Sequence, residues 1–218
     1  MTASPGSRFA RNRPKALELF ARRGFAQVSL RELARHLELT AGSLYSHCAS
    51  KEELLLEFIE EHYLALLSLF DQRRLRGCPK AALQRVVEGL VALYESNPLH
   101  FQLATRDAGC LNDEQRQCVE RLRRQLGQKL DAQLGAAGYA SPGQACQPTL
   151  ELFEHLPLWL ARYPLDRQQR CAALLRSLTA ALAPGAWRLK RRGRHGAGPA
   201  AAQKRTATPA VTLNGSPG

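Results

Sequence analysis

Hydrophobic residues recur at intervals of three and four positions along most of the chain, and this spacing predicts helices. Near the N-terminus the pattern is made by Leu30, Leu33, Ala34 and Leu37, which would lie on one face of a helix. No alternating pattern of useful length predicts a β-strand. The sequence therefore predicts an all-α fold.

Three hydroxyl residues precede consecutive helical segments near the N-terminus: Ser29, Thr40 and Ser50. A hydroxyl at such a position can accept a hydrogen bond from a backbone N–H that the helix leaves unpaired. Glu32 and Glu53 follow the two serines by three residues, which predicts reciprocal capping boxes. The turn at 38–40 is short enough for the steep crossing of a helix-turn-helix. Residues 29–51 therefore predict this motif and the start of a longer helix.

Apolar stripes separated by proline and glycine breaks predict six further helices, at about 50–74, 79–96, 99–106, 113–135, 148–163 and 166–182. The segment 148–163 is apolar on every face and contains Pro157, which should kink it. A helix that is apolar all round must be covered on all sides, and one way is a core on one face and a partner subunit on the other. Four arginines of 113–135 are interpreted as a solvated face: Arg116, Arg121, Arg123 and Arg124.

These elements predict four regions: a flexible basic arm at 1–12, a helix-turn-helix DNA-binding domain at 13–50, a helical ligand-binding and dimerisation domain at 51–184, and a disordered basic tail at 185–218. The tail is rich in Gly, Ala, Pro and Arg, and it cannot bury enough apolar surface to fold. Residues 183–218 supply +7 of the net charge of +12. The basic character of the chain is therefore mainly a property of this tail.

Composition narrows the functional classes. Apolar residues make up 44% of the chain, enough for a core, but no run of about 18 of them predicts a membrane span. The first seven residues lack the apolar segment of a signal peptide, so a cytoplasmic protein is expected. The chain has no glycine-rich phosphate loop, zinc-protease motif, serine-hydrolase motif or paired carboxylates. Neither an enzyme nor a cofactor is predicted.

The chain has six cysteines, at positions 48, 78, 110, 118, 146 and 171. None forms a CxxC pair, and no histidine pair completes a zinc pattern, so no metal site is predicted. We interpret the cysteines as reduced thiols. A thiol redox switch is the alternative, and it would require an exposed thiol of low pKa beside a base.

Several short motifs occur together between residues 13 and 56: Gly24-Phe25, Gly42-x-x-Tyr45, His47 and Ser50-Lys51-Glu52. In this combination the segment resembles the N-terminal domain of the TetR (tetracycline-repressor) family. The resemblance implies a first helix with a glycine stop at 17–25, a second helix at 29–37, a recognition helix at 40–45 and the start of a long fourth helix at 50–54. One position departs from the family. Cys48 stands where phenylalanine is usual, and the smaller side chain should loosen the core of the small domain.

The resemblance and the local chemistry together give the expected DNA-binding residues: Ser29, Arg31, Thr40, Ala41, Gly42, Ser43, Tyr45, His47 and Lys51. Tyr45, His47 and Lys51 match family positions that grip phosphates, although Tyr45 and His47 could instead serve in packing. Arg31 is the one long donor expected to reach a base edge or a phosphate. The methyl group of Ala41 suits contact with a thymine methyl.

Two basic segments add further hypotheses. Arg8, Arg11 and Arg13 are expected to enter the adjacent minor groove, as basic arms do. The tail between 188 and 205 either adds non-specific phosphate affinity or is a solvated tail without a role. If the chain forms a homodimer on double-stranded DNA, its two motifs would read half-sites about 34–36 Å apart, which implies a palindromic operator.

The C-terminal domain is larger than dimerisation requires. In the TetR family it usually holds a small-molecule cavity, and ligand binding changes the spacing of the two helix-turn-helix units, which releases the DNA. We expect an apolar or amphipathic effector, with His100, His155 and Gln102 as the polar groups that could orient it. The expected pocket residues are His100, Phe101, Phe153, His155 and Trp159. The last two helices form the dimer interface in the family, which implies contacts at Leu152, Leu156, Leu160, Leu174 and Leu178.

The predicted function is a DNA-binding transcriptional regulator, a repressor released from a palindromic operator by a small ligand. The alternative is an architectural or partner-controlled DNA-binding dimer without a ligand. A cavity of a few hundred Å³ in the C-terminal domain would favour sensing, since ligand pockets have volumes of this order. A fully packed interior would favour the alternative.

Overall fold

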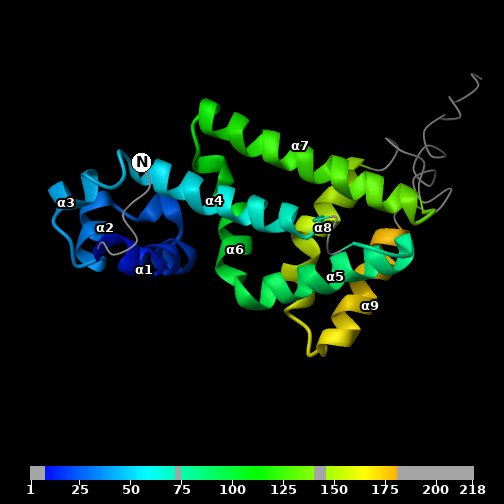
Figure 1. The fold of residues 1–218 in the computed structure, drawn as a ribbon. Coiled ribbons are helices and arrows are strands. Elements are labelled where there is room, and N and C mark those ends of the chain that lie inside the picture. The colour runs from blue at the N-terminus through cyan, green and yellow to red at the C-terminus, as the bar shows by residue number, and fades with distance from the viewer. Residues whose placement is uncertain (1–7, 72–74, 140–145, 181–218) are drawn as a thin grey trace, which may run out of the picture. The chain divides into compact units, whose positions relative to one another are not determined.

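A computed structural model describes residues 8–71, 75–139 and 146–180, and every regular element in these ranges is helical (Figure 1). This confirms the all-α prediction, while the predicted tail at 185–218 and residues 1–7 lie outside the described ranges. The elements in chain order are α1 Arg8–Arg23, η1 Phe25–Gln27, α2 Leu30–His36, α3 Ala41–Tyr45, α4 Lys51–Ser68, α5 Pro79–Ser96, α6 Pro98–Arg106, η2 Ala108–Cys110, α7 Asp113–Ala136, α8 Cys146–Leu160 and α9 Arg167–Ala180. None of these helices is long and apolar enough to cross a membrane.

Side chains cap the helices of the N-terminal motif as predicted. The hydroxyls of Ser29, Thr40 and Ser50 each accept a hydrogen bond from the backbone N–H three residues later, at 3.2, 3.1 and 3.0 Å. Gly24 ends α1 with a φ of 88°, a left-handed conformation that glycine adopts without steric cost. Glu38 has a φ of 56° in the turn between α2 and α3, which is uncommon for a residue with a side chain.

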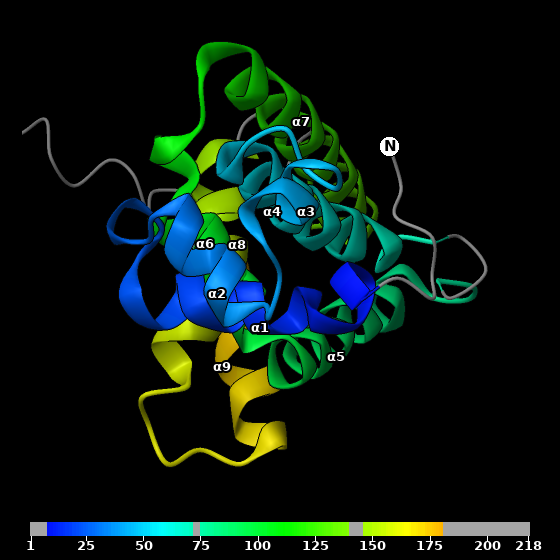
Figure 2. The same cartoon turned by 90° about the vertical axis from the view of Figure 1, so that its left-hand side faces the viewer.

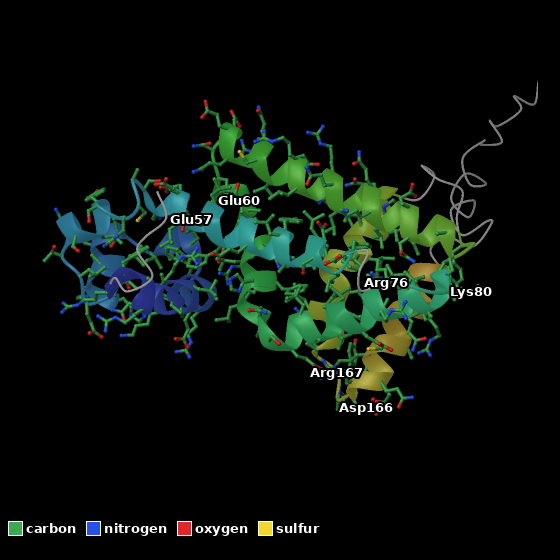
Figure 3. All side chains as sticks on the ribbon, viewed as in Figure 1. Glu57, Glu60, Arg76, Lys80, Asp166 and Arg167 are labelled. Atoms are coloured by element: carbon green, nitrogen blue, oxygen red, sulfur yellow. The ribbon has the colours of Figure 1, made fainter. Side chains whose placement is uncertain are left out.

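The two predicted capping boxes are wrong in their second half. The Glu32 carboxylate pairs with Arg23, and the Glu53 carboxylate accepts from the N–H of Ala49 at 2.6 Å. Neither carboxylate therefore returns to its serine. Reciprocal capping boxes form instead at the start of α7, between Asn112 and Gln115, and at the start of α9, between Asp166 and Gln169. Figure 3 labels Asp166.

Helix α1 begins at Arg8, so the prediction of a flexible arm at 1–12 is wrong for residues 8–12. Phe9 is only 3% exposed, and its ring stacks on His47 with 4.8 Å between centroids. The amide of Asn12 donates to the backbone carbonyl of Leu37 at 2.8 Å. These contacts attach the first turns of α1 to α2 and α3.

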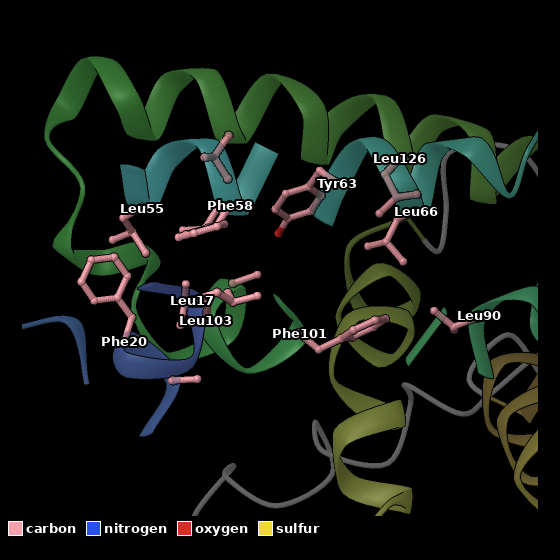
Figure 4. Packing of buried hydrophobic residues seen from close by; sticks show 14 of the residues in the cluster. Leu17, Phe20, Leu55, Phe58, Tyr63, Leu66, Leu90, Phe101, Leu103 and Leu126 are labelled. Carbon is pink, nitrogen blue, oxygen red and sulfur yellow. The ribbon is translucent and has the colours of Figure 1, made fainter. Parts of the chain in front are cut away.

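Helix α4 joins the N-terminal helices to the rest of the described chain. Its most extensive contacts are with α7 and α6. Leu55 and Phe58 of α4 belong to one hydrophobic cluster with Leu17 and Phe20 of α1 and Leu103 of α6 (Figure 4). The view in Figure 2 looks onto α1, α2 and α3, with α4 leading away from them. The helix-turn-helix and the C-terminal helices therefore share a core.

The other helix bounds lie close to the predicted ones, with one exception. Helix α4 ends at Ser68, well before the predicted end near residue 74. Residues 72–74 lie outside the described ranges. Pro157 lies inside α8, which continues to Leu160.

The dimer prediction requires correction. Four of the five predicted contact residues are buried within a single chain: Leu156, Leu160, Leu174 and Leu178. Because α8 packs against α6, α7 and α9, these leucines build the chain's own core and offer no surface to a partner. Leu152 is partly buried. The large apolar side chains that do reach the surface of this region are Trp159 and Tyr163, which are 51% and 45% exposed.

The described cysteines are free thiols in contrasting surroundings. Cys48 is 3% exposed, and its thiol donates to the carbonyl of Leu44. Burial raises the pKa of Cys48 to about 11, with the carboxylates of Glu53 and Glu57 adding to the rise. Cys78 is exposed at the start of α5, where the backbone N–H groups of the next residues, beginning with Lys80, lower the pKa of its thiol.

We expect iodoacetamide at neutral pH to alkylate Cys78 at least tenfold faster than Cys48, because the thiolate is the reacting species and only Cys78 is accessible. Peptide mass spectrometry over a time course measures both rates in one sample. Unfolding in denaturant should bring the two rates together. Equal rates in the folded protein would contradict the described surroundings of Cys48.

Candidate nucleic-acid interface and ligand cavity

Helix α3 has one buried and one exposed face. Leu44 is fully buried under the motif, while Ala41 and Gly42 are exposed and Ser43 is half-buried. Tyr45 is 56% exposed, so it does not serve in packing within the chain. The small side chains leave the backbone of α3 open to close approach, as docking into a major groove requires.

The hydroxyls of Ser29 and Thr40 mark the N-terminal ends of α2 and α3. Each oxygen accepts a backbone N–H of its own helix, so its O–H remains able to donate to a phosphate oxygen. The two groups are exposed. Both predicted positions are thus compatible with a phosphate contact as well as with capping.

His47 and Lys51 are more engaged within the fold than predicted. His47 is half-buried against Phe9. The ammonium of Lys51 donates to the carbonyls of Phe25 and Val28, at 3.2 and 3.0 Å, and lies 4.3 Å from the centroid of the Phe25 ring. Lys51 therefore ties the start of α4 to the loop before α2, and one of its three N–H donors remains for a phosphate.

The arginines of the motif fall into two groups. Arg13 pairs with Glu57 and Glu61 of α4 and lies 4.4 Å from the Phe58 ring centroid (Figure 3 labels Glu57). Arg13 thus holds α1 against α4, and its predicted place in a minor groove is wrong. The arginines without an ion pair to any described residue are Arg8, Arg11, Arg31 and Arg35.

Arg35 was missed by sequence reasoning. It follows Arg31 by four residues on α2, and both side chains are exposed, so they lie on the same face of the helix. The spacing was visible in the sequence, but it could not show that neither guanidinium has a carboxylate partner in the described fold. Two such cations can neutralise phosphates, which is the main source of salt-dependent DNA affinity.

A substitution at Gly42 tests the effect of α3 on DNA binding separately from any effect on the stability of the fold. A Cβ at this position would meet no atom within 4 Å, and alanine in place of glycine inside a helix should raise the free energy of unfolding by up to about 1 kcal/mol. We expect Gly42→Ala to keep or slightly raise the thermal stability but to weaken DNA binding roughly tenfold, or about 1.4 kcal/mol, because the added methyl group would stand between α3 and bases docked against it.

The matched control is Gly109→Ala, which also has open space around the new Cβ but lies in η2. Fluorescence anisotropy with DNA selected by the protein gives both affinities, and thermal unfolding gives both stabilities. If G42A binds this DNA as tightly as the unmodified chain, the exposed face of α3 is not the docking surface.

The C-terminal domain contains a cavity of about 300 Å³. Segments from α4, α6, η2, α7 and α8 surround it. Its lining residues are His62, Tyr63, Ala104, Thr105, Ala108, Gly109, Leu111, Arg116, Val119, Glu120, Arg123, Glu154 and His155. The described residues contain no group of three or more His, Cys, Asp or Glu side chains placed to hold a metal ion.

Of the predicted pocket residues, only His155 lines this cavity. Phe101 (labelled in Figure 4) and Phe153 are fully buried in the core, and Phe101 contacts the rings of His62 and Tyr94 edge-on. Trp159 is on the surface. His100 pairs with Glu61 at 3.6 Å. Helical periodicity placed these residues on apolar helix faces, but it could not show which of them lie in the packed core and which line a cavity.

A buried polar cluster forms one side of the cavity. Arg123 donates to both carboxylate oxygens of Glu154 at 3.0–3.1 Å, and the Tyr63 hydroxyl donates to the same carboxylate at 2.9 Å. The hydrogen bonds to Glu154 raise the pKa of Arg123, and burial followed by the Glu154 charge raises that of Tyr63. Arg123 was predicted to be solvated; it reaches inward because Glu154 lies opposite it on α8.

His62 lies beside this cluster and is 3% exposed. Its ring contacts Tyr63 and Phe101 edge-on, with centroids 5.3 and 4.5 Å apart. Burial lowers the pKa of His62 to about 3, with a smaller contribution from the charge of His100. The imidazole is therefore neutral at neutral pH, and it carries one N–H donor and one nitrogen acceptor.

One wall of the cavity is connected directly to the end of α1. Arg106 donates to the carbonyls of Phe20 and Ala21, at 2.7 and 2.8 Å, and pairs with Asp107 at 2.7 Å. Gln102, predicted to orient a ligand, instead donates to the carbonyl of Ala21 at 3.1 Å. Thr105 and Ala108, which lie close to Arg106 in the chain, line the cavity, so the residue that holds the end of α1 lies next to the cavity wall.

Comparison with known proteins agrees with this description. Residues 15–58 match the family model for bacterial regulatory proteins of the tetR family. This range contains most of α1, the helix-turn-helix and the first part of α4.

Solved structures share the fold over a larger part of the chain. The TetR family transcriptional regulator PfmR from Thermus thermophilus is 24% identical, with a TM-score of 0.66 over 79% of this chain and 97% of its own. The ketosteroid transcriptional regulator KstR2 of Mycobacterium tuberculosis is 21% identical, with a TM-score of 0.63 over 82% and 96%. AibR, solved with isovaleryl coenzyme A and operator DNA, is 18% identical, with a TM-score of 0.65 over 79% and 98%.

Proposed function

We propose that the chain is a TetR-family repressor that a small ligand releases from a palindromic operator, since residues 15–58 match the model of the tetR family of bacterial regulatory proteins. DNA-binding transcriptional regulation follows from the family. The observation that carries the sensing step is a cavity whose wall includes Thr105 and Ala108, the near neighbours of Arg106, which holds the end of α1. The proposed units are a DNA-binding unit from residue 8 to 50 and a sensing and dimerisation unit from 51 onward.

The proposed DNA-facing surface combines side chains that contact bases with side chains that contact phosphates. The exposed face of α3 would enter the major groove, with Gly42 permitting close approach and Tyr45 reaching a phosphate. The O–H groups of Ser29 and Thr40 and the cations of α2 would hold the flanking phosphates. Few of these side chains can form bidentate contacts with bases, so specificity would depend on methyl contacts, on Arg31 and on half-site spacing.

The proposed dimer surface is the outer side of α8. Trp159 and Tyr163 are exposed, with ring centroids 4.8 Å apart, and Leu152 and Leu175 are only partly buried by the chain itself. Exposed apolar residues that gather in this way are typical of interaction sites. Pairing through this surface would give the two-fold symmetry that a palindromic operator mirrors.

Selection of bound fragments from genomic DNA tests the operator and dimer proposals together. We expect a palindrome whose half-sites are separated by about one helical turn or a multiple of it. Trp159→Glu should make the protein monomeric and weaken operator binding at least roughly a hundredfold, since the avidity of two half-sites is lost.

The control for this substitution is Leu64→Glu, at a side chain of α4 that is 55% exposed and is not part of the proposed interface. Sedimentation measurements should find L64E dimeric and W159E monomeric. A dimeric W159E with unchanged operator affinity would show that another surface pairs the subunits.

Sensing is favoured over an architectural dimer by the cavity. Its volume of about 300 Å³ is at the lower end of the roughly 300–1,000 Å³ usual for ligand pockets. AibR, a protein of similar fold, was solved with both a coenzyme A ester and operator DNA, and the name of KstR2 refers to a ketosteroid. These structures support a ligand-responsive C-terminal domain, although they do not indicate the same ligand.

The link from cavity to α1 can be cut without leaving a buried charge. The double variant Arg106→Met, Asp107→Asn removes the hydrogen bonds from Arg106 to α1. It also removes the buried Asp107 carboxylate, which would otherwise lose its ion-pair partner. We expect the free energy of unfolding to fall by about 1–3 kcal/mol and operator affinity to fall roughly tenfold, because α1 is then held less firmly against α6.

Gln102→Met is the matched control, since it removes one hydrogen bond to the same carbonyl and should have a smaller effect on both quantities. Denaturant titration and fluorescence anisotropy measure them. A loss of stability with unchanged operator affinity would show that Arg106 only stabilises the fold and does not position the helix-turn-helix.

A further inference from the structure

We propose that the cavity binds a compact, uncharged molecule whose hydroxyl or carbonyl group is hydrogen-bonded by His62 and whose apolar body lies against Ala104, Ala108, Leu111 and Val119. This inference rests on the proposed function, because it assigns a ligand class to the same cavity. It goes beyond that function by naming the recognising side chain and the charge of the ligand.

The first observation is that His62 is buried and has no hydrogen-bond partner among the described residues. Its residue is 3% exposed and lines the cavity, and none of the described residues gives or accepts a hydrogen bond with its imidazole. Among the described residues, Tyr63 and Phe101 contact its ring edge-on. A ligand with one polar group would give this imidazole the hydrogen bond that no described residue supplies.

The second observation is that the charges deep in the cavity neutralise one another. Arg123 and Glu154 form a two-pronged ion pair, and Tyr63 donates to the same carboxylate. Glu154 is 4% exposed. A charged ligand would find no unpaired countercharge here, and burial of an uncompensated charge is strongly unfavourable.

The third observation concerns the other charged groups. Arg116 and Glu120 line the cavity but are exposed to solvent, and Arg116 pairs with Asp113. They lie where the ligand would meet water. The buried end of the cavity thus offers a neutral donor and acceptor at His62, which fits a hydroxyl or carbonyl group. The apolar residues of α6, η2 and α7 cover the rest of the ligand.

Three probes with one carbon skeleton test the charge of the ligand. Naphthylmethanol, naphthoate and naphthylmethylammonium differ only in the polar group, and calorimetric titration gives their affinities for the full chain. We expect the alcohol to bind at least tenfold more tightly than either ion. Tighter binding of an ion than of the alcohol, or binding of none of the three, would overturn the proposal.

Substitutions of His62 test the contact. His62→Leu should weaken binding of the alcohol about tenfold, the value of one hydrogen bond. His62→Gln keeps a donor and an acceptor and should retain binding within about threefold, which also guards against a folding defect in H62L. His36→Leu, at an exposed histidine of α2 that does not line the cavity, is the matched control and should leave binding unchanged. Equal binding by H62L and the unmodified chain contradicts the assignment.

Release of operator DNA by naphthylmethanol is measured separately by anisotropy. If the alcohol binds through His62 but releases no DNA, the ligand chemistry stands and the proposed sensing function fails. If another class of compound releases the DNA and binds equally well to H62L, sensing stands and the His62 proposal fails.

Discussion

The described fold depends on how the C-terminal end of α1 is held. The last carbonyls of a helix have no partner within it, and at this end they are satisfied by side chains of α6. Arg106 binds the carbonyls of Phe20 and Ala21, Gln102 binds that of Ala21, and Gly24 closes the turn with its own N–H on Phe20. The chain therefore enters the helix-turn-helix from a point that side chains of α6 hold in place.

This contact explains why so short a reading element can be stable. Helix α3 has five residues, far fewer than a helix needs to persist alone in water. It is ordered by the burial of Leu44, by the Thr40 cap and by α1 and α4 around it. Because α1 and α4 also pack on α6 and α7, the position of α3 is tied to the helices that surround the cavity, and this is the connection through which the proposed ligand would act.

Local features could be predicted from the sequence because they depend on neighbours in the chain. The hydroxyl caps and the helix periodicity belong to this class. The cluster of Arg123, Glu154 and Tyr63 could not be predicted, since its members are 31 to 91 residues apart. Periodicity also marked the leucines of α8 and α9 as buried without showing whether the chain or a partner covers them. Because these leucines are buried within one subunit, they cannot form the predicted dimer contacts.

Calorimetric unfolding tests most directly the claim that the reading motif and the cavity domain are one cooperative body. The full chain should unfold in a single transition whose calorimetric and van't Hoff enthalpies agree, measured over a range of concentrations in which the oligomeric state is constant. Two separate transitions, with the helix-turn-helix melting first while α4 to α9 remain folded, would contradict the account.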